Sequence, residues 1–287
     1  MSCLALESVC DSSESMKDTN SPIVFFDSGV GGLPYLEYAR QVLPGQRYAY
    51  FADRAGFPYG EKTKEEVIQL VLNATETIVR FLDPKVLVIA CNTATELAIH
   101  TIRSVHPGIP IVGTVPAIKP AAALSKIKRV AVVATERAVH DPYLLDLAAR
   151  WAADCHVERI GDGKLVDFVE TRLIGSTETE RLDAVGPSVQ RALDAGADTL
   201  VLGCTHFIHL AREFAQAAGS EVGIIDSRAG VIDQLVRILG AQPSGYDGTE
   251  SKKGDAMMYL SGPEPFGSRY ESFASRFGLV PAGSLLP

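Results

Sequence analysis

The stretch KVLVIACNTAT, Lys85–Thr95, decides the fold, because it joins a buried strand directly to a polar turn. Its apolar residues Val86–Ala90 run without a polar break, which is typical of a strand buried on both faces of a parallel sheet. Cys91 follows at once, and a helix-forming run comes next. Open α/β sheets bind their ligands outside the carboxyl ends of such strands. The sequence therefore predicts a ligand site around Cys91, Asn92 and Thr93.

A second stretch, DTLVLGCTHFIHL, Asp198–Leu210, has the same form. Cys204 closes its apolar run, and Thr205 and His206 follow. Cys91 and Cys204 thus occupy equivalent local positions, each expected at a helix N-terminus. The helix dipole and free N–H groups stabilise a thiolate there, so we expect the thiol pKa, ordinarily about 8.5, to be lowered toward working pH.

The composition and charge of the chain limit its partners. Of 287 residues, 46% are hydrophobic, which allows one large domain or two of ordinary size. The formal net charge of −8 argues against a nucleic acid or an anionic membrane surface as partner. No apolar run approaches the roughly 20 residues that span a bilayer. We therefore expect no nucleic-acid partner and no membrane partner.

The cysteines and the N-terminus indicate the compartment. The five cysteines are odd in number and lack CxxC spacing, so they suggest neither a disulfide framework nor a zinc site. No basic residue precedes Lys17, and the only apolar patch before it is Leu4–Leu6, which does not make a secretory signal. We expect a cytoplasmic protein. Residues 1–21 are rich in Ser, Asp and Glu and are expected to form a disordered tail.

Short apolar strands alternate with helical runs, which is the pattern of parallel α/β sheets. A helix from about Thr63 to Leu82 opens with the spacing of a capping box at Thr63–Glu66. Met257–Leu260 is expected as an edge strand. The other expected strands, besides the two that precede Cys91 and Cys204, are Ile23–Phe26, Arg47–Ala52, Ile111–Val115, Val130–Ala134, His156–Ile160 and Gly223–Asp226.

The predicted fold class is α/β, with two similar lobes. Each lobe is expected to be a mainly parallel sheet flanked by helices, with the active site in the cleft between them. Residues 22–114 plus 222–287 would form the first lobe, and residues 115–221 the second. Two similar halves that meet at a cleft would bring the two cysteine-bearing strand ends together.

A glycine-rich loop, Asp27–Gly32, follows the first strand and opens a helix, Leu33–Leu43. Its spacing is neither G-x-G-x-x-G nor a P-loop, because Pro34 stands at the place of the third glycine and no Gly-Lys-Ser/Thr follows. Glycines let backbone N–H groups approach an anion closely, and a carboxylate serves as well as a phosphate. The loop therefore predicts an anion contact without identifying the anion.

Two thiols in equivalent positions favour one type of reaction. A buried free Cys is usually inert, and this is the preferred interpretation of Cys155 and an open one for Cys91 and Cys204. A single Cys with a His would suggest acyl transfer. Inversion of a stereocentre by proton transfer needs a base on one face of the substrate and an acid on the other, and the two exchange roles in the reverse direction. Matched thiols suit that task, provided that other donors stabilise the carbanion-like transition state.

Four motifs in this order and spacing carry a resemblance: Asp27-Ser28-Gly-Val-Gly-Gly-Leu, Pro58-Tyr59-Gly60, Ala90-Cys91-Asn92-Thr93-Ala94 and Gly203-Cys204-Thr205-His206. Together they resemble the cofactor-independent glutamate racemases of the aspartate/glutamate racemase superfamily. The likeness runs from about Pro22 to Leu279, and the ending from Tyr259 onward is also similar to that family.

The resemblance implies a two-base racemase that needs neither pyridoxal phosphate nor a metal. Cys91 would exchange the α-proton on the D-glutamate side, and Cys204 on the L-glutamate side. Asp27 would assist near Cys91, and His206 and Glu170 near Cys204. The resemblance also implies a homodimer that supplies D-glutamate for peptidoglycan. Positions that match substrate-holding residues are Asp27, Ser28, Tyr59, Gly60, Asn92, Thr93, Thr135, Thr205 and His206.

Simpler interpretations of three of these residues stay open. Asp27 could cap a helix, Glu170 could lie on a solvated helix face, and His206 could merely bind the backbone. The other histidines are expected to be structural or exposed, because no pair has convincing metal-ligand spacing. These histidines are His100, His106, His140, His156 and His209.

Two departures from the family pattern bear on the substrate. Ala138 stands where the family often has a second Thr, so a hydrogen bond to a carboxylate is lost or is replaced from elsewhere. The stretch Gly113–Pro120 also differs, which leaves the fine substrate preference and any effector site open. A racemase for aspartate or another amino acid is the close alternative, although His206 favours glutamate. An amino-acid binding protein and a dithiol redox protein are the alternatives of other classes.

Overall fold

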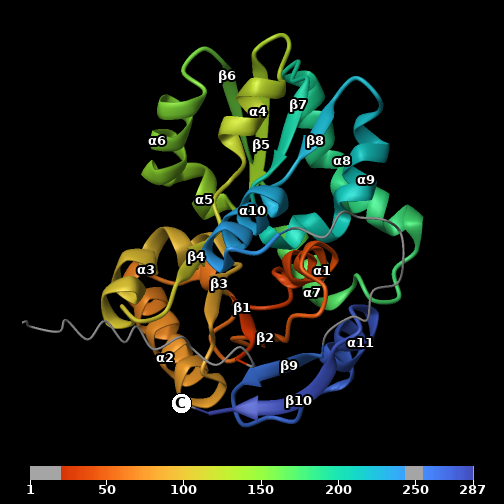
Figure 1. The fold of residues 1–287 in the computed structure, drawn as a ribbon. Coiled ribbons are helices and arrows are strands. Elements are labelled where there is room, and N and C mark those ends of the chain that lie inside the picture. Colours follow the sequence, from red (N-terminus) through yellow and green to blue (C-terminus); the bar gives the residue numbers. More distant parts are fainter. Residues whose placement is uncertain (1–20, 243–254, 287) are drawn as a thin grey trace, which may run out of the picture.

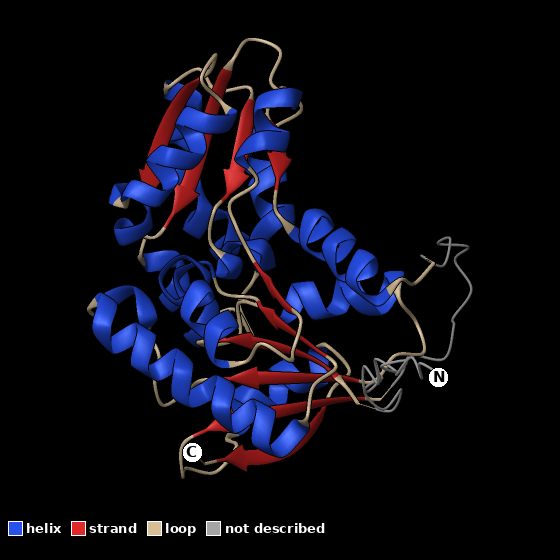
Figure 2. Cartoon of the chain, turned by 60° about the vertical axis from the view of Figure 1, so that its left-hand side comes forward, coloured by secondary structure: helices blue, strands red, loops and turns tan. Residues whose placement is uncertain are grey.

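The structure, a computed structural model, describes residues 21–242 and 255–286. The tail expected over residues 1–21 lies outside the described residues except for Ser21, which is buried. The described chain forms two lobes, each built on its own parallel sheet (Figure 1). Helices flank both sheets, as Figure 2 shows. The predicted fold class, α/β with two lobes, is confirmed.

The first lobe contains a six-stranded sheet with the order β10-β9-β2-β1-β3-β4. All residues of the central strand β1 are buried, as expected for a parallel sheet covered on both faces. The strands are β1 (Ile23–Asp27), β2 (Tyr48–Ala52), β3 (Val86–Ile89), β4 (Ile111–Gly113), β9 (Ala256–Ser261) and β10 (Val280–Leu285). The helices are α1 (Leu33–Val42), the 3-10 helix η1 (Tyr59–Glu61), α2 (Lys64–Leu82), α3 (Asn92–Val105), α10 (Arg228–Leu239) and α11 (Ser268–Arg276).

The second lobe contains a four-stranded sheet with the order β6-β5-β7-β8. Its strands are β5 (Arg129–Ala134), β6 (His156–Gly161), β7 (Thr199–Leu202) and β8 (Gly223–Ile225). Its helices are α4 (Ile118–Leu124), α5 (Glu136–His140), α6 (Pro142–Trp151), α7 (Lys164–Thr171), α8 (Glu178–Asp194), the 3-10 helix η2 (Thr205–Leu210) and α9 (Ala211–Ala218). The largest apolar core cluster is continuous through both lobes.

Two sequence expectations about strands are corrected, and one strand was not expected. The division at residue 222 placed Gly223–Ile225 in the first lobe, but this strand pairs with β7 in the second sheet. A three-residue strand carries no pattern that identifies its neighbour. Strand β9 is not at an edge, because it lies between β2 and β10. Strand β10 escaped prediction, since its sequence VPAGSL contains Pro and Gly, which are depleted in strands.

Two features of the helices bear on the prediction. The capping box at Thr63 is present: the Thr63 side chain accepts from the Glu66 N–H, and the Glu66 carboxylate accepts from the Thr63 N–H. Helix α2 therefore begins where the sequence predicts. None of the described helices is long and apolar enough to cross a membrane.

Candidate active site

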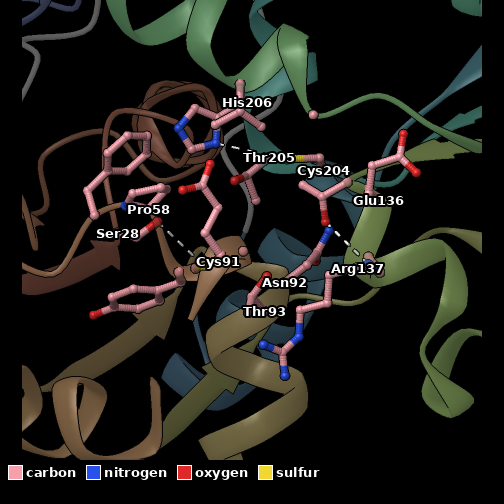
Figure 3. A pocket seen from close by; sticks show the side chains of 18 of the residues that line it. Ser28, Pro58, Cys91, Asn92, Thr93, Glu136, Arg137, Cys204, Thr205 and His206 are labelled. Atoms are coloured by element: carbon pink, nitrogen blue, oxygen red, sulfur yellow. Dashed lines mark hydrogen bonds between the residues drawn. The ribbon is translucent and has the colours of Figure 1, made fainter. Parts of the chain in front are cut away.

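The two cysteine-bearing strand ends face one pocket between the lobes. β1 and β3 pair in register and end together, so the first lobe presents Asp27 and Cys91 at one edge. β5 and β7 do the same in the second lobe for Thr135 and Cys204. Both thiols line a pocket of about 200 Å³ (Figure 3). It is smaller than the roughly 300–1,000 Å³ of typical drug-sized sites, so it suits one small molecule.

Cys91 is the N-cap residue of α3, and the residue is only 6% exposed. Its Sγ lies 3.9 Å from Ser28 Oγ, and the Ser28 hydroxyl donates to Asp27 Oδ1 at 3.1 Å. Burial raises the pKa of the Cys91 thiol well above its ordinary value, and the Asp27 charge adds to this. The N–H groups of Ala94 and Ser28 oppose the rise but do not overcome it. The expected lowering of the thiol pKa is therefore wrong for Cys91.

Cys204 is the N-cap residue of η2, a six-residue 3-10 helix rather than the α-helix expected there. Its Sγ lies 3.9 Å from Nδ1 of His206. The other ring nitrogen, Nε2, lies 2.8 Å from Oε1 of Glu170. Glu170 is 1% exposed on α7, so the solvated-face interpretation is wrong. His206 does not merely bind the backbone, because it joins a carboxylate to a thiol.

The charges of His206 and Glu170 stabilise each other. Burial would lower the pKa of His206, but hydrogen bonds with Cys204 and Glu170 outweigh it and raise the pKa well above its ordinary value. Burial would raise the pKa of Glu170, but its hydrogen bond and charge interaction with His206 lower it. At neutral pH the pair is an imidazolium and a carboxylate. A cation beside a sulfur atom stabilises the thiolate form.

Asp27 connects the two lobes. It is fully buried, and its Oδ1 also accepts the Gly29 N–H at 3.2 Å. Its Oδ2 accepts the Thr205 hydroxyl of the second lobe at 3.0 Å. Burial raises its pKa, although the charge of His206 lowers it in part. Asp27 does not cap the next helix, because the N-cap of α1 is Gly32.

The glycine-rich loop binds the carboxylate of Glu170 through a backbone N–H group. The Val30 N–H donates to Glu170 Oε1 at 2.8 Å. A Cβ at Gly29 would lie 2.0 Å from that oxygen, and a Cβ at Gly31 would lie 2.5 Å from Nδ1 of His206. This N–H group is thus bound to a side chain of the protein, and the contact with a ligand anion stays a prediction. The glycines are needed because Glu170 and His206 lie against the loop.

Other predicted residues use part of their hydrogen-bonding capacity within the protein. Asn92 donates through Nδ2 to the Gly203 carbonyl at 2.6 Å, across the lobes, and its buried Oδ1 has no hydrogen-bond partner in the described chain. The Tyr59 hydroxyl donates to Asp53 at 2.5 Å. Asp27 and Glu170 lie behind the pocket wall. The predicted residues that line it are Ser28, Tyr59, Gly60, Cys91, Asn92, Thr93, Thr135, Cys204, Thr205 and His206.

Comparison with known proteins identifies the family of this fold and pocket. Residues 35–235 match the family described as Asp/Glu/Hydantoin racemase. The chain belongs to that family. A glutamate racemase of Treponema pallidum (strain Nichols) is 35% identical over 263 residues, 91% of this chain and 95% of the relative. One of Shewanella sp. (strain MR-7) is 37% identical over 240 residues, 83% of this chain and 87% of the relative.

A solved structure extends this likeness to three dimensions. The crystal structure of Escherichia coli glutamate racemase, in complex with L-glutamate and the activator UDP-MurNAc-ala, matches with a TM-score of 0.82 at 31% sequence identity. The match covers 93% of this chain and 98% of that chain. As a member of the racemase family, the chain is an isomerase that acts as an amino-acid racemase.

The racemase pocket also contains residues that the sequence did not single out. Phe57 stands beside the imidazole of His206, with ring centroids 6.1 Å apart. Glu136 and Arg137, in the first turn of α5, add charge to the wall. They lie between Thr135 and Ala138, so the motif around Thr135 could have directed attention to them. Nothing in the local sequence distinguishes these charges from those of a solvated helix face.

Proposed function

We propose that the protein is a glutamate racemase that interconverts L- and D-glutamate by proton transfer through two cysteines. The observation that carries this proposal is the pair of thiols, Cys91 and Cys204, each at a strand end of its own lobe and both lining one small pocket. The names of the relatives from Treponema pallidum and Shewanella supply the substrate. The homologue complexed with L-glutamate supports it.

The reaction is a balanced exchange of two protons. From D-glutamate, the Cys91 thiolate takes the α-proton, and the Cys204 thiol gives a proton to the opposite face of the carbanion-like centre. L-glutamate leaves, with Cys91 protonated and Cys204 as thiolate. The reverse reaction exchanges the roles. No net proton or electron is consumed, and no cofactor is assigned a step.

The two thiols would be activated by different neighbours. Cys91 rests as a thiol because of burial. Its proton can leave toward Asp27 through the Ser28 hydroxyl, which lies between the two groups. The Cys204 thiolate would be stabilised by the His206 imidazolium, which Glu170 holds in its charged form. We assign catalytic roles to the two cysteines and assisting roles to Asp27, His206 and Glu170.

The remaining pocket residues would hold the substrate and stabilise the charge that develops in the transition state. The Asn92 Oδ1 atom, buried and without a partner in the described chain, is a natural acceptor for an ammonium group. Because the Tyr59 hydroxyl already donates to Asp53, we assign the Tyr59–Gly60 contact to the backbone. The residues proposed to hold the substrate line the pocket, and Asp27 would act through the hydroxyls of Ser28 and Thr205. The lining residues are Ser28, Tyr59, Gly60, Asn92, Thr93, Thr135, Thr205 and His206.

Heavy-water exchange tests the proposal. With L-glutamate in D₂O, the protein should abolish net optical rotation and replace the α-proton by deuterium, without added pyridoxal phosphate. Aspartate is the matched competing substrate. Faster loss of rotation with aspartate than with glutamate would assign the neighbouring specificity instead.

Cysteine variants test the mechanism. Cys91→Ala and Cys204→Ala should each lower kcat for racemisation by at least about a hundredfold, since general acid–base catalysis is commonly worth 10²–10⁴. Cys155→Ala, a partly buried free cysteine of the second lobe outside the pocket, is the matched control and should keep full activity. Near-normal turnover in either active-site variant would rule out the two-base assignment, provided that circular dichroism shows both variants folded.

The biological setting is part of the same proposal. D-glutamate produced in the cytoplasm would supply peptidoglycan synthesis, and the protein would act as a homodimer, as the family resemblance implies. We also propose the division into a first lobe of residues 22–114 with the C-terminal segment, and a second lobe from residue 115, with the boundary after β8. Depletion of the protein should cause a growth defect that added D-glutamate relieves.

A further inference from the structure

Arg137 places a positive charge in the wall of the pocket. It lies in the first turn of α5, which begins at the N-cap Thr135. Among the described residues that line the pocket, it is the only arginine or lysine. In Figure 3 its side chain extends toward Thr93, whereas the carboxylate of the neighbouring Glu136 points away from it. The pocket therefore offers a cation on the side where the first lobe meets α5.

The Arg137 guanidinium is anchored across the lobes. Its Nη1 donates to the backbone carbonyl of Lys62, which directly follows η1 and the pocket residues Tyr59 and Gly60. An arginine carries five N–H donors in a planar fork, and this bond uses one of them. This hydrogen bond holds the guanidinium beside the pocket, and its remaining N–H donors match the geometry of a carboxylate.

Two carboxyl groups near Arg137, those of Glu96 and Asp141, together carry about one negative charge at neutral pH rather than two. Glu96 on α3 is hydrogen-bonded to Asp141 at the end of α5, and both feel the Arg137 charge. Burial and the contact with Asp141 raise the pKa of Glu96 to about 8, so at neutral pH the pair carries mainly one negative charge. This one negative charge offsets that of Arg137, and Glu61 and Glu136 also line the pocket, so Arg137 would recognise an anion through its remaining N–H donors rather than through a net positive charge.

The reaction geometry indicates which substrate carboxylate Arg137 would meet. The proposed reaction puts the α-carbon between the two sulfur atoms, so its ammonium and carboxylate groups would both lie beside residues that adjoin the cysteines, such as Asn92 and Thr205. A carboxylate at the end of the side chain extends farther, toward the walls. Ala138, in the same turn as Arg137, has no hydroxyl to offer it.

We propose that Arg137 is a specificity-determining residue that pairs with the side-chain carboxylate of the substrate. The inference rests on the proposed glutamate reaction and deepens it. It explains how a chain with Ala138 would recognise a dicarboxylic amino acid. The Arg137 guanidinium would take the place of the threonine hydroxyl that the family often has at position 138. It also makes recognition depend on lobe contact, because the fork belongs to one lobe and its anchor to the other.

Arg137→Gln and Arg137→Lys test the assignment. Arg137→Gln should raise KM for glutamate by about 10- to 100-fold, the range expected for a lost charge-assisted hydrogen bond. The kcat should stay within about threefold, because the contact exists in ground state and transition state alike. Arg137→Lys keeps the charge and should recover part of the affinity. Arg159→Gln is the matched control, since Arg159 also donates to a backbone carbonyl, of Val139, outside the pocket.

Competitive inhibitors separate recognition from a structural effect. Glutarate carries two carboxylates, and glutaramate carries one carboxylate and one amide. Arg137→Gln should weaken glutarate at least about tenfold more than glutaramate. Equal weakening of both inhibitors, or of neither, would overturn the inference, and so would an unchanged KM. If the wild-type protein fails to exchange the α-proton of glutamate, the proposed function fails instead, so the two failures are distinguishable.

Discussion

At the scale of single residues, the two thiols are alike in sequence and unlike in surroundings. Cys91 is buried beside a carboxylate, which favours the neutral thiol. Cys204 faces an imidazole whose charge is held by Glu170. A reaction that inverts one carbon atom needs opposite protonation states on its two faces at any moment. For such a reaction the two thiols meet neighbours of opposite charge: the Asp27 carboxylate reaches Cys91 through Ser28, and the His206 imidazolium lies beside Cys204.

Glu170→Gln should reveal the role of that imidazolium. Without the Glu170 carboxylate, the pKa of His206 should fall, so the imidazolium should be lost at a lower pH. The alkaline limb of the pH–rate profile should therefore shift to lower pH. Proton removal from L-glutamate should become slower than removal from D-glutamate. The deuterium isotope effect on kcat should therefore rise more for α-deuterated L-glutamate than for the D enantiomer.

Glu178→Gln, which changes an exposed carboxylate on α8, serves as the control for this measurement. An unchanged pH–rate profile in Glu170→Gln, with the same isotope effect for both enantiomers, would contradict the role given to His206.

The sequence located most of the pocket wall at the residue scale, because cysteines that end apolar runs have a recognisable pattern. It did not give their charge states. The pKa of Cys91 depends on burial and on Asp27, and neither can be read from the turn around Cys91. Arg137 was missed because its importance comes from the Lys62 carbonyl, which lies far away in the chain.

At the scale of elements, the loop between β1 and α1 is shaped by side chains of the second lobe. Val30 donates its N–H to Glu170 and its carbonyl oxygen lies 2.9 Å from Nε2 of His209. His209 therefore acts through the backbone, in agreement with the structural role expected for it. The loop has little freedom to change shape without disturbing the groups around His206.

Gly31→Ala tests how tightly this loop is fitted. A Cβ there would lie 2.5 Å from His206 Nδ1 and 2.6 Å from Thr205 Oγ1, so at least one must move. Overpacking of this kind typically costs about 1–3 kcal/mol of unfolding free energy. Chemical denaturation should show that loss together with a fall in kcat. Gly108→Ala, where a Cβ meets nothing within 4 Å, should change neither quantity. Full activity in Gly31→Ala would show that the loop adapts.

The elements that the sequence predicted well are those with a strong local signal. The capping box fixed the start of α2, and the long apolar runs fixed β3 and β7. Prediction failed where a neighbour decides the structure. β8 has three residues and takes its place from its pairing with β7, and the helix expected after Cys204 is the 3-10 helix η2.

At the scale of the whole molecule, the lobes are joined at several points around the pocket. Asn92 bonds the Gly203 carbonyl, Thr205 bonds Asp27, and Arg137 bonds the Lys62 carbonyl. The continuous apolar core supports the same junction from behind. The relative position of the lobes therefore determines the surroundings of both thiols.

The Glu96–Asp141 pair makes part of this junction dependent on pH. The folded pKa of Glu96 is raised to about 8 from an ordinary value of 4.5. Its contribution to stability is fully present below pH 4.5 and is lost as pH rises toward 8. The lowered pKa of Asp141 acts in the opposite sense, and its contribution is lost only below its ordinary value of 3.8. The two effects therefore fall in separate ranges of pH.

Glu96→Gln should flatten the decline in the thermal midpoint between pH 5 and pH 8, because an amide hydrogen-bonds Asp141 without ionising. Thermal unfolding measured across that range checks this. Glu65→Gln on α2, an exposed carboxylate, should leave the wild-type slope in place. The same slope in Glu96→Gln and wild type would mean that the pair does not hold its proton in the folded protein.

The hydrogen bond from Thr205 to Asp27 has a consequence for inhibition. A molecule that separates the two lobes by a few ångströms would break this bond and leave Asp27 without its Thr205 partner. It would also move His206 away from the glycine-rich loop. Such an inhibitor would lower the activity of the enzyme without occupying the substrate pocket. Because it would not compete with the amino acid, a higher substrate concentration would not restore activity.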